Sequence, residues 1–227
     1  MALTGRVAVV TGAGTPVAEG IAEALRTTGA VVGLVDGDRL RTRDLAAAAF
    51  AEVSERAAAP VDAFVHAFVD TAATRPMPLA DVDAATFDGA WEGTMQAALF
   101  ALQAAFGQMR GRGGRILVVT PTASMSGAAG LVPYTMAVEG LRLLAKSAAR
   151  QWGADGITVN CLAPAPEVAL GDDTVAGESV SLAPPALGRP GDPATDLGPV
   201  AAWLIGPDSG FVTGVTVCAD GGTWMAP

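Results

Sequence analysis

Short runs of β-branched residues alternate with longer alanine- and leucine-rich stretches along this chain. The short runs are almost continuously apolar, which is typical of strands that are buried on both faces of a sheet. Strands are therefore expected at residues 6–11, 31–36, 61–66, 115–119, 156–160 and 215–219, and helices at residues 16–28, 46–59, 84–110, 134–153 and 194–205. This alternation predicts an α/β fold with a doubly wound parallel sheet, in a single domain over residues 1–227.

The connection after the second expected strand is short. Only 24 residues separate Asp36 from Val61, and residues 46–59 already have a helical pattern. A parallel crossover needs a dozen or more residues, so a helix, another strand and a second helix do not fit in this interval. We therefore expect the sheet to be truncated at the crossover between its second and third strands, with residues 41–45 forming a stub of strand at most.

Composition excludes several classes of function. The 23 acidic residues outnumber the 14 basic ones, and the formal charge of -9 disfavours a nucleic-acid partner. No apolar run reaches the roughly 18 residues of a membrane-spanning helix. The N-terminus lacks the pattern of a secretory leader, so we expect a cytoplasmic protein that does not bind membranes. The two cysteines and one histidine have no metal-ligand spacing, so no metal site is expected.

Several motifs follow the expected strands. The segment Thr11-Gly12-Ala13-Gly14 precedes the first helix, where backbone amides can receive a dinucleotide pyrophosphate, and Asp36 ends the second strand, where an acid can bind ribose hydroxyls. Tyr134 opens a long helix, and glycine-rich residues 210–222 lie near the C-terminus. Together these motifs resemble the short-chain dehydrogenase/reductase family over essentially the whole chain. The resemblance implies a Rossmann-like fold and, if a cofactor is bound, NAD(H).

The resemblance also implies a set of catalytic positions. The family uses a tyrosine, a lysine four residues later, a serine thirteen residues earlier and an asparagine in the preceding long helix. Tyr134 occupies the tyrosine position. The other three positions hold, in that order, Val138, Pro121 and Thr94. Thr120 and Thr122 flank the proline and are candidates to orient a substrate.

The missing lysine matters most for the chemistry. An unperturbed tyrosine has a pKa near 10, and an adjacent cation lowers such a pKa by about one to three units. Val138 carries no charge, and Arg142 and Lys146 lie roughly 12 and 18 Å further along the same helix. Tyr134 is therefore either a residual general acid or a fold remnant beside the pocket. The only histidine, His66, is either a replacement base or a structural residue at a strand end.

The cofactor loop departs from the family pattern as well. Pro16 and Ala18 replace two glycines of the family's Thr-Gly-x-x-x-Gly-x-Gly loop, and a proline removes an amide donor. Phe68 stands where family members have small residues that let the cofactor pass. Weak binding of NAD(H), if any, is therefore expected at the candidate cofactor-binding residues, which are Gly12, Gly14, Asp36, Asp44, Ala67 and Pro164. Asp36 has two interpretations: it selects NAD(H) through the ribose hydroxyls, or it only ends a strand.

The two long helices, at about residues 84–110 and 134–153, resemble the pair through which family members form a four-helix dimer interface. An apolar stripe with three- or four-residue spacing marks the first of them: Trp91, Met95, Leu99, Leu102 and Phe106. The alternative is that this stripe packs on the chain's own sheet. We expect a dimer or tetramer, built from identical chains or together with an active family member.

Two hypotheses for the function follow. In the favoured one, the chain is a pseudoenzyme, a non-catalytic subunit that supports an active dehydrogenase paralogue, such as one acting on hydroxyacyl-CoA thioesters. In the other, it is an atypical NAD(H)-dependent carbonyl reductase or alcohol dehydrogenase that uses Tyr134 as the acid. Residues 165–193 are rich in proline, glycine and acidic residues, which predicts a mobile loop over a pocket and identifies no substrate.

Overall fold

The computed structural model describes residues 3–170, 184–189 and 191–225. Within these residues, six strands form one parallel sheet in the order β2-β1-β3-β4-β5-β6. The strands are β1 (Val7–Thr11), β2 (Val31–Val35), β3 (Ala63–His66), β4 (Gly114–Val119), β5 (Ile157–Pro164) and β6 (Thr216–Ala219). The α-helices are α1 (Pro16–Thr27), α2 (Arg43–Ala57), α3 (Ala84–Met109), α4 (Ala123–Ser126), α5 (Val132–Trp152), α6 (Pro166–Leu170) and α8 (Gly198–Leu204). Shorter helical turns are η1 (Gly37–Leu40), η2 (Thr71–Thr74), η3 (Leu79–Asp81), η4 (Gly153–Asp155), η5 (Pro193–Leu197) and η6 (Pro207–Ser209).

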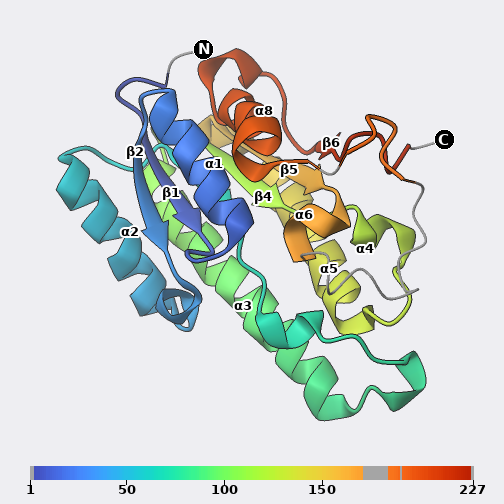
Figure 1. The fold of residues 1–227 in the computed structure, drawn as a ribbon. Helices are drawn as coiled ribbons and strands as arrows, with labels where there is room; N and C mark the ends of the chain where they lie inside the picture. The colour runs from blue at the N-terminus through green and yellow to red at the C-terminus, as the bar shows by residue number, and fades with distance from the viewer. Residues whose placement is uncertain (1–2, 171–183, 190, 226–227) are drawn as a thin grey trace.

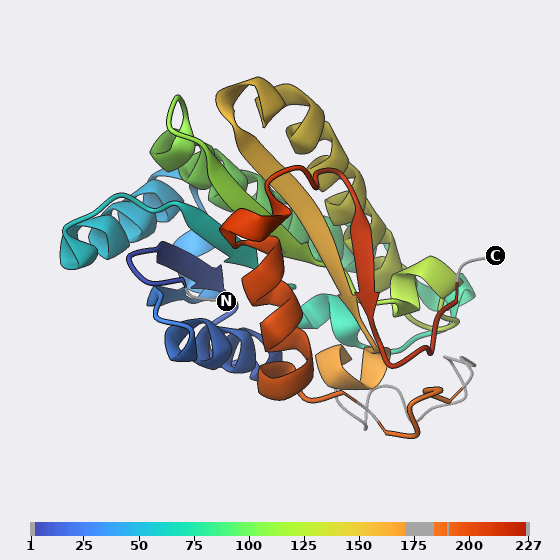
Figure 2. The ribbon, with the colours of Figure 1, turned by 90° about the horizontal axis from the view of Figure 1, so that it is seen from above.

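Helices cover both faces of the sheet, as Figures 1 and 2 show. In β1, Ala8 and Val10 belong to the core beneath α1 and α8, whereas Val7 and Val9 belong to the core beneath α2, α3 and α5. Every residue of β1, β3 and β5 is buried. This two-sided burial explains why consecutive apolar positions, instead of alternating ones, mark these strands in the sequence.

The structure confirms the expected fold, a single α/β domain with a Rossmann-like, doubly wound parallel sheet. The truncation is confirmed too, because β2 is an edge strand and α2 is the one α-helix that leads from it to β3. The expected stub of strand at residues 41–45 is wrong. The hydroxyl of Thr42 accepts a hydrogen bond from the amide of Leu45 (3.2 Å), and Asp44 lies in the first turn of α2. These residues cap and start a helix and so cannot extend the sheet.

The segment expected as a loop at residues 165–193 begins as a helix. Strand β5 continues to Pro164, and α6 (Pro166–Leu170) follows directly. Residues 171–183 and 190, which belong to the same expected loop, lie outside the described residues. Across the described part of the chain, no helix combines the length and the apolar character needed to cross a membrane.

Candidate functional site

Two hollows at the carboxyl edge of the sheet lie beside the motifs that follow β1, β2 and β3. The larger has a volume of about 560 Å³ and is called the acidic cavity here, because it is lined by Asp36, Asp38, Asp70 and Glu92. The smaller has a volume of about 160 Å³ and is called the tyrosine chamber, because Tyr134 lines it. Ligands of open α/β sheets bind at this edge, so the two hollows are the candidate site.

A four-residue segment directly after β3 contributes to both hollows. Phe68 and Asp70 line the acidic cavity, whereas Ala67 and Val69 line the tyrosine chamber. Phe68 also packs against the turn after β2, since a Cβ atom at Gly37 would overlap its ring. A dinucleotide that reached from one hollow to the other would have to pass over this segment.

The glycine loop after β1 keeps part of the geometry expected of a phosphate-binding loop. Gly12 has a φ of +98°, and a Cβ atom there would lie 2.7 Å from the carbonyl oxygen of Ala67, so only glycine fits. Thr15 caps α1 by accepting a hydrogen bond from the amide of Ala18 (3.3 Å). The amide of Gly14, however, donates to a carboxylate oxygen of Glu19 (3.0 Å). A negative side chain thus occupies a donor that a phosphate would use.

The acidic cavity surrounds the predicted ribose-binding residue. Asp36 is exposed and caps η1, because its carboxylate accepts a hydrogen bond from the amide of Arg39 (3.1 Å). Arg41 pairs with Asp38 (2.8 Å), but Asp70 and Glu92 add two further negative charges from other segments. Asp44 is exposed on α2 and is not among the residues that line the cavity.

Tyr134 lies at the start of α5 with its side chain only 2% exposed. It packs in a small apolar cluster together with Val138, which is fully buried. Burial raises the pKa of the phenol above its ordinary value, and no described residue forms a hydrogen bond or ion pair with the hydroxyl to counteract this. The phenol therefore keeps its proton at neutral pH.

The polar residues around Pro121 do not supply hydroxyls to the chamber. The hydroxyl of Thr122 donates to the carbonyl oxygen of Pro164 (3.2 Å), and Thr120 is fully buried. From this segment, the chamber is lined by Val119 and Pro121. Neither of the predicted substrate-orienting residues lines the chamber: the Thr122 hydroxyl serves local structure, and the buried Thr120 hydroxyl has no hydrogen-bond partner among the described residues.

Thr94, which stands at the family's asparagine position, is also fully buried. Its hydroxyl accepts a hydrogen bond from the amide of Asp70 (3.2 Å). The Thr94 hydroxyl therefore helps to hold the segment after β3 that lines both hollows.

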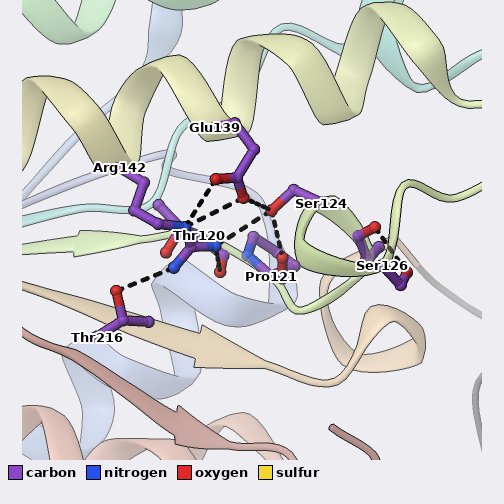
Figure 3. Close-up of polar contacts among 8 residues, drawn as sticks. Thr120, Pro121, Ser124, Ser126, Glu139, Arg142 and Thr216 are labelled. Atoms are coloured by element: carbon purple, nitrogen blue, oxygen red, sulfur yellow. Dashed lines mark hydrogen bonds and ion pairs between the residues drawn. The ribbon is translucent and has the colours of Figure 1, made fainter. Parts of the chain in front are cut away.

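A buried arginine cluster lies beside the chain around Pro121, and the sequence interpretation missed it (Figure 3). Nε of Arg142 donates to both carboxylate oxygens of Glu139 (3.1 and 3.2 Å). Nη1 donates to the hydroxyl of Thr216 (3.1 Å). Nη2 donates to the hydroxyl of Ser124 (3.1 Å) and the carbonyl oxygen of Thr120 (3.3 Å). One guanidinium therefore joins α5, α4, β6 and the end of β4.

The arginine cluster holds the chain around Pro121 through hydrogen bonds to its backbone carbonyl oxygens. The hydroxyl of Ser124 lies 2.9 Å from the carbonyl oxygen of Pro121 and 2.7 Å from a carboxylate oxygen of Glu139. A signal existed in the sequence, because Glu139 and Arg142 stand three positions apart in an otherwise mostly apolar helix, the spacing of neighbours on one helix face.

His66 is fully buried at the end of β3. One ring nitrogen, Nδ1, lies 2.9 Å from the hydroxyl of Thr11, and among the described residues Nε2 has no partner. Burial lowers the pKa of His66 to about 4. The ring lines neither hollow, which favours its structural interpretation over that of a replacement base.

Comparisons with known proteins identify the family to which the chain belongs. Residues 40–223 match the family model described as enoyl-(acyl carrier protein) reductase. A diacetyl reductase ((S)-acetoin forming) of Staphylococcus aureus is 30% identical over 173 residues, which cover 69% of this chain and 67% of the relative. The chain belongs to the short-chain dehydrogenase/reductase family.

Two further comparisons show how much of the chain is similar in sequence and how much is similar in fold. The 3-oxoacyl-(acyl-carrier-protein) reductase of Vibrio cholerae is 34% identical over 124 residues, which are 52% of this chain and only 49% of the relative, so the match spans about half of that protein. The structure of a 3-ketoacyl-(acyl-carrier-protein) reductase from Brucella melitensis, complexed with NADH, superposes with a TM-score of 0.82 over 98% of this chain and 99% of that one. At 22% identity, this second likeness shows the fold.

Within the short-chain dehydrogenase/reductase fold, the predicted site residues separate into two groups. Ala67 and Tyr134 line the tyrosine chamber, Asp36 lines the acidic cavity, and Gly12 packs against the carbonyl group of Ala67. Pro164 accepts hydrogen bonds from Thr122 and lines neither hollow.

Proposed function

We propose that this short-chain dehydrogenase/reductase family member is a non-catalytic subunit that supports an active family member in a mixed dimer or tetramer. The observation that carries the proposal is the environment of Tyr134. Its ring is buried in the same apolar cluster as Val138, which stands where family members place a lysine, and burial raises the pKa of the phenol. General acids and bases work best when their pKa lies near the operating pH, and here it is displaced in the opposite direction.

The residues at the strand ends also fit NAD(H) poorly. Glu19 occupies the amide of Gly14, Asp70 and Glu92 add negative charge to the cavity around the predicted ribose-binding residue Asp36, and the ring of Phe68 packs against Gly37 in the same cavity. The tyrosine chamber, at about 160 Å³, is smaller than the several hundred Å³ of typical cofactor pockets. These features support weak or absent dinucleotide binding, and we derive no hydride-transfer step.

Exposed apolar side chains on the two long helices support an oligomer. Phe87, Trp91 and Leu99 on α3, and Leu143 on α5, are each more than one-third exposed. Large exposed apolar side chains on adjacent helices are typical of surfaces that another chain covers. This surface is where the proposed catalytic partner, or a second copy of this chain, would pack.

The alternative function is an atypical NAD(H)-dependent carbonyl reductase or alcohol dehydrogenase. The likeness to a diacetyl reductase favours it, as does the position of Tyr134 on a hollow at the carboxyl edge of the sheet. In that case, Tyr134 would donate its proton to the substrate oxygen, and Asp36 would bind the ribose of the cofactor.

Titration of the purified chain with NADH separates the two functions. We expect no saturable change in NADH fluorescence and no shift of the thermal unfolding midpoint up to millimolar NADH, because a ligand of the native state must stabilise it. An intact family member serves as the positive control. Micromolar binding together with turnover of small ketones by this chain alone would overturn the proposal. Co-purification with an intact family member, tested by mass spectrometry of the complex, addresses the partner.

A further inference from the structure

Strand β2 leaves one edge of the sheet open. It pairs with β1 on one side, and no other described strand pairs with its opposite side (Figure 1). The truncated crossover explains this position, because α2 is the one α-helix between β2 and β3. The edge of a sheet carries unpaired backbone N–H and C=O groups that can pair with another strand. The open edge of β2 is therefore a candidate surface for association.

The hydrogen bonds to the β1 side identify the backbone groups that point outward. The amide of Val31 donates to a carbonyl oxygen just before β1 (2.9 Å), and the carbonyl oxygen of Val35 accepts from the glycine loop after β1 (2.9 Å). Alternate residues of a strand in a parallel pair direct their backbone groups to the same side, so Gly33 faces β1 as well. The N–H and C=O groups of Val32 and Leu34 therefore point away from the sheet.

The side chains of β2 do not protect this edge. The strand reads Val-Val-Gly-Leu-Val and contains neither a charged residue nor a proline, which are the usual protection against edge pairing. The side chain of Val31 is 51% exposed. Arg26, in the last turn of α1, approaches the edge, but its Nη2 lies 3.5 Å from the carbonyl oxygen of Val32, at the limit of a hydrogen bond.

The edge is complementary to itself. When a second copy lies antiparallel about a two-fold axis at Gly33, Val32 pairs with Leu34 of the second copy, and Leu34 pairs with Val32 of the second copy. These are the residues whose backbone groups point outward, and each such pair exchanges both of its N–H···O bonds, so four hydrogen bonds form. Val31 then lies opposite Val35 of the second copy. Every cross-strand pair of side chains is apolar, as stable antiparallel pairs require.

Charges beside the strand favour the same orientation. Arg26 is exposed next to Val32, and Asp36 is exposed directly after the C-terminal end of β2. In the antiparallel arrangement, the C-terminal end of each strand lies beside the N-terminal half of the other strand. Asp36 of each copy is therefore brought toward Arg26 of the other copy, and the two-fold axis produces this pairing of opposite charges twice.

We propose that two copies of this chain associate through their β2 edges, antiparallel about Gly33, and so form one continuous sheet across both molecules. The contact is separate from the apolar surface on α3 and α5, and it does not depend on whether the chain is catalytic. Five strand residues from each copy are fewer than the roughly 20 to 30 of a standard interface, so we expect a Kd on the order of 100 µM.

Sedimentation velocity of the purified chain, from about 5 to about 500 µM, measures the association. The chain carries Leu143→Lys throughout, a charge on an exposed residue of α5 that disfavours association through the long helices. Val32→Pro then removes the outward amide from both copies, and so two of the four hydrogen bonds, without removing a bond to β1. We expect this variant to associate at least about tenfold more weakly.

A second variant keeps the strand backbone unchanged. Val31→Lys places a charge at an exposed position that faces Val35 of the second copy, and we expect it to weaken association to a similar degree. Leu79→Lys makes a comparable change at an exposed residue of η3 and serves as the control, with association unaltered. Thermal unfolding verifies that each variant is folded.

The register is tested by a spin label on the edge. Val31→Cys, made together with Cys218→Ser, provides one accessible thiol, because Cys161 is buried. Four residues along the strand at about 3.3 Å each, and one strand spacing of about 4.8 Å, place the two labelled backbone positions about 14 Å apart. We expect dipolar broadening of the EPR spectrum at high protein concentration, and its loss when the labelled chain is diluted with unlabelled chain.

Three results would overturn the inference. The chain stays monomeric up to about 500 µM, Val32→Pro associates as strongly as its parent, or the labelled chain shows no broadening while it associates. Protection of the Val32 and Leu34 amides from hydrogen exchange only in a complex with a different protein would assign the edge to that protein and overturn the inference as well. Micromolar NADH binding, in contrast, would contradict the non-catalytic proposal and leave these measurements unaffected.

Discussion

Tyr134 and Arg142 are both buried on α5, about two turns apart, but they differ in the hydrogen bonds that their polar groups form. Arg142 donates to four other residues from its three nitrogen atoms, and its side chain is 8% exposed. Tyr134 is buried more completely, but the described residues offer no partner to its hydroxyl, and a hollow opens in front of it. A buried polar group whose hydrogen bonds are all made, such as the Arg142 guanidinium, ties elements of the fold together, whereas the Tyr134 hydroxyl forms no such bond with the described residues.

The comparison is tested most strongly by removing the charge of Arg142. Arg142→Met leaves two buried oxygen atoms without their donor, the carbonyl oxygen of Thr120 and the hydroxyl of Ser124, so we expect the free energy of unfolding to fall by roughly 2 to 4 kcal/mol. Urea denaturation followed by tryptophan fluorescence measures the change. Arg150→Met, which removes an exposed arginine from the last turn of the same helix, serves as the control and should cost about 0.5 kcal/mol or less. Similar losses in the two variants would show that the cluster adds no stability.

His66 is an intermediate case, with one ring nitrogen bonded and the other unpaired. Its pKa is lowered to about 4 in the folded chain, from about 6.5 in the unfolded chain. Between pH 6.5 and 4 the unfolded chain binds a proton that the folded chain does not, so stability falls as the pH is lowered. At about 1.36 kcal/mol per unit, the total loss is about 3 kcal/mol.

The measurement is the free energy of unfolding from pH 7 to pH 4, for the unmodified chain and for His66→Asn. Carboxylates contribute to both curves, and their share cancels in the difference. We expect the curve of the variant to be shallower by about 3 kcal/mol over this interval. Parallel curves would mean that His66 titrates normally in the folded protein.

The smallest effect is expected at Tyr134 itself. Tyr134→Phe removes a hydroxyl that has no described partner and keeps the ring in its apolar cluster. We therefore expect the free energy of unfolding to stay the same or to rise by up to about 1 kcal/mol, in contrast to the large loss at Arg142. A decrease of 1 kcal/mol or more would show that the hydroxyl has a structural partner, and would remove the distinction between the two residues.

The sequence was sufficient for most of the fold because the buried strands consist of consecutive apolar residues, and because residue spacing alone excludes a full unit between Asp36 and Val61. The error at residues 41–45 arose because a helix cap, Thr42, looks like a polar interruption when it is read without its backbone. Local hydrogen bonding of this kind decides an element's boundary and leaves little trace in hydrophobic periodicity.

The candidate site was less predictable for a physical reason. Motif spacing placed Tyr134 and Gly12 at the carboxyl edge of the sheet, where the ends of parallel strands meet. It did not reveal that Glu19 accepts from the amide of Gly14, or that Arg142 reaches Thr216, which lies 74 positions further along the chain. Such contacts depend on side-chain directions between elements that only the assembled fold brings together.

The segment after β3 gives the two hollows a degree of independence. Neighbouring side chains in this segment line different hollows. A substitution of Phe68 or Asp70 therefore alters the width or the charge of the acidic cavity, while Ala67 and Val69 still line the tyrosine chamber. A single substitution in this segment can thus change the lining of one hollow and leave the lining of the other as it is.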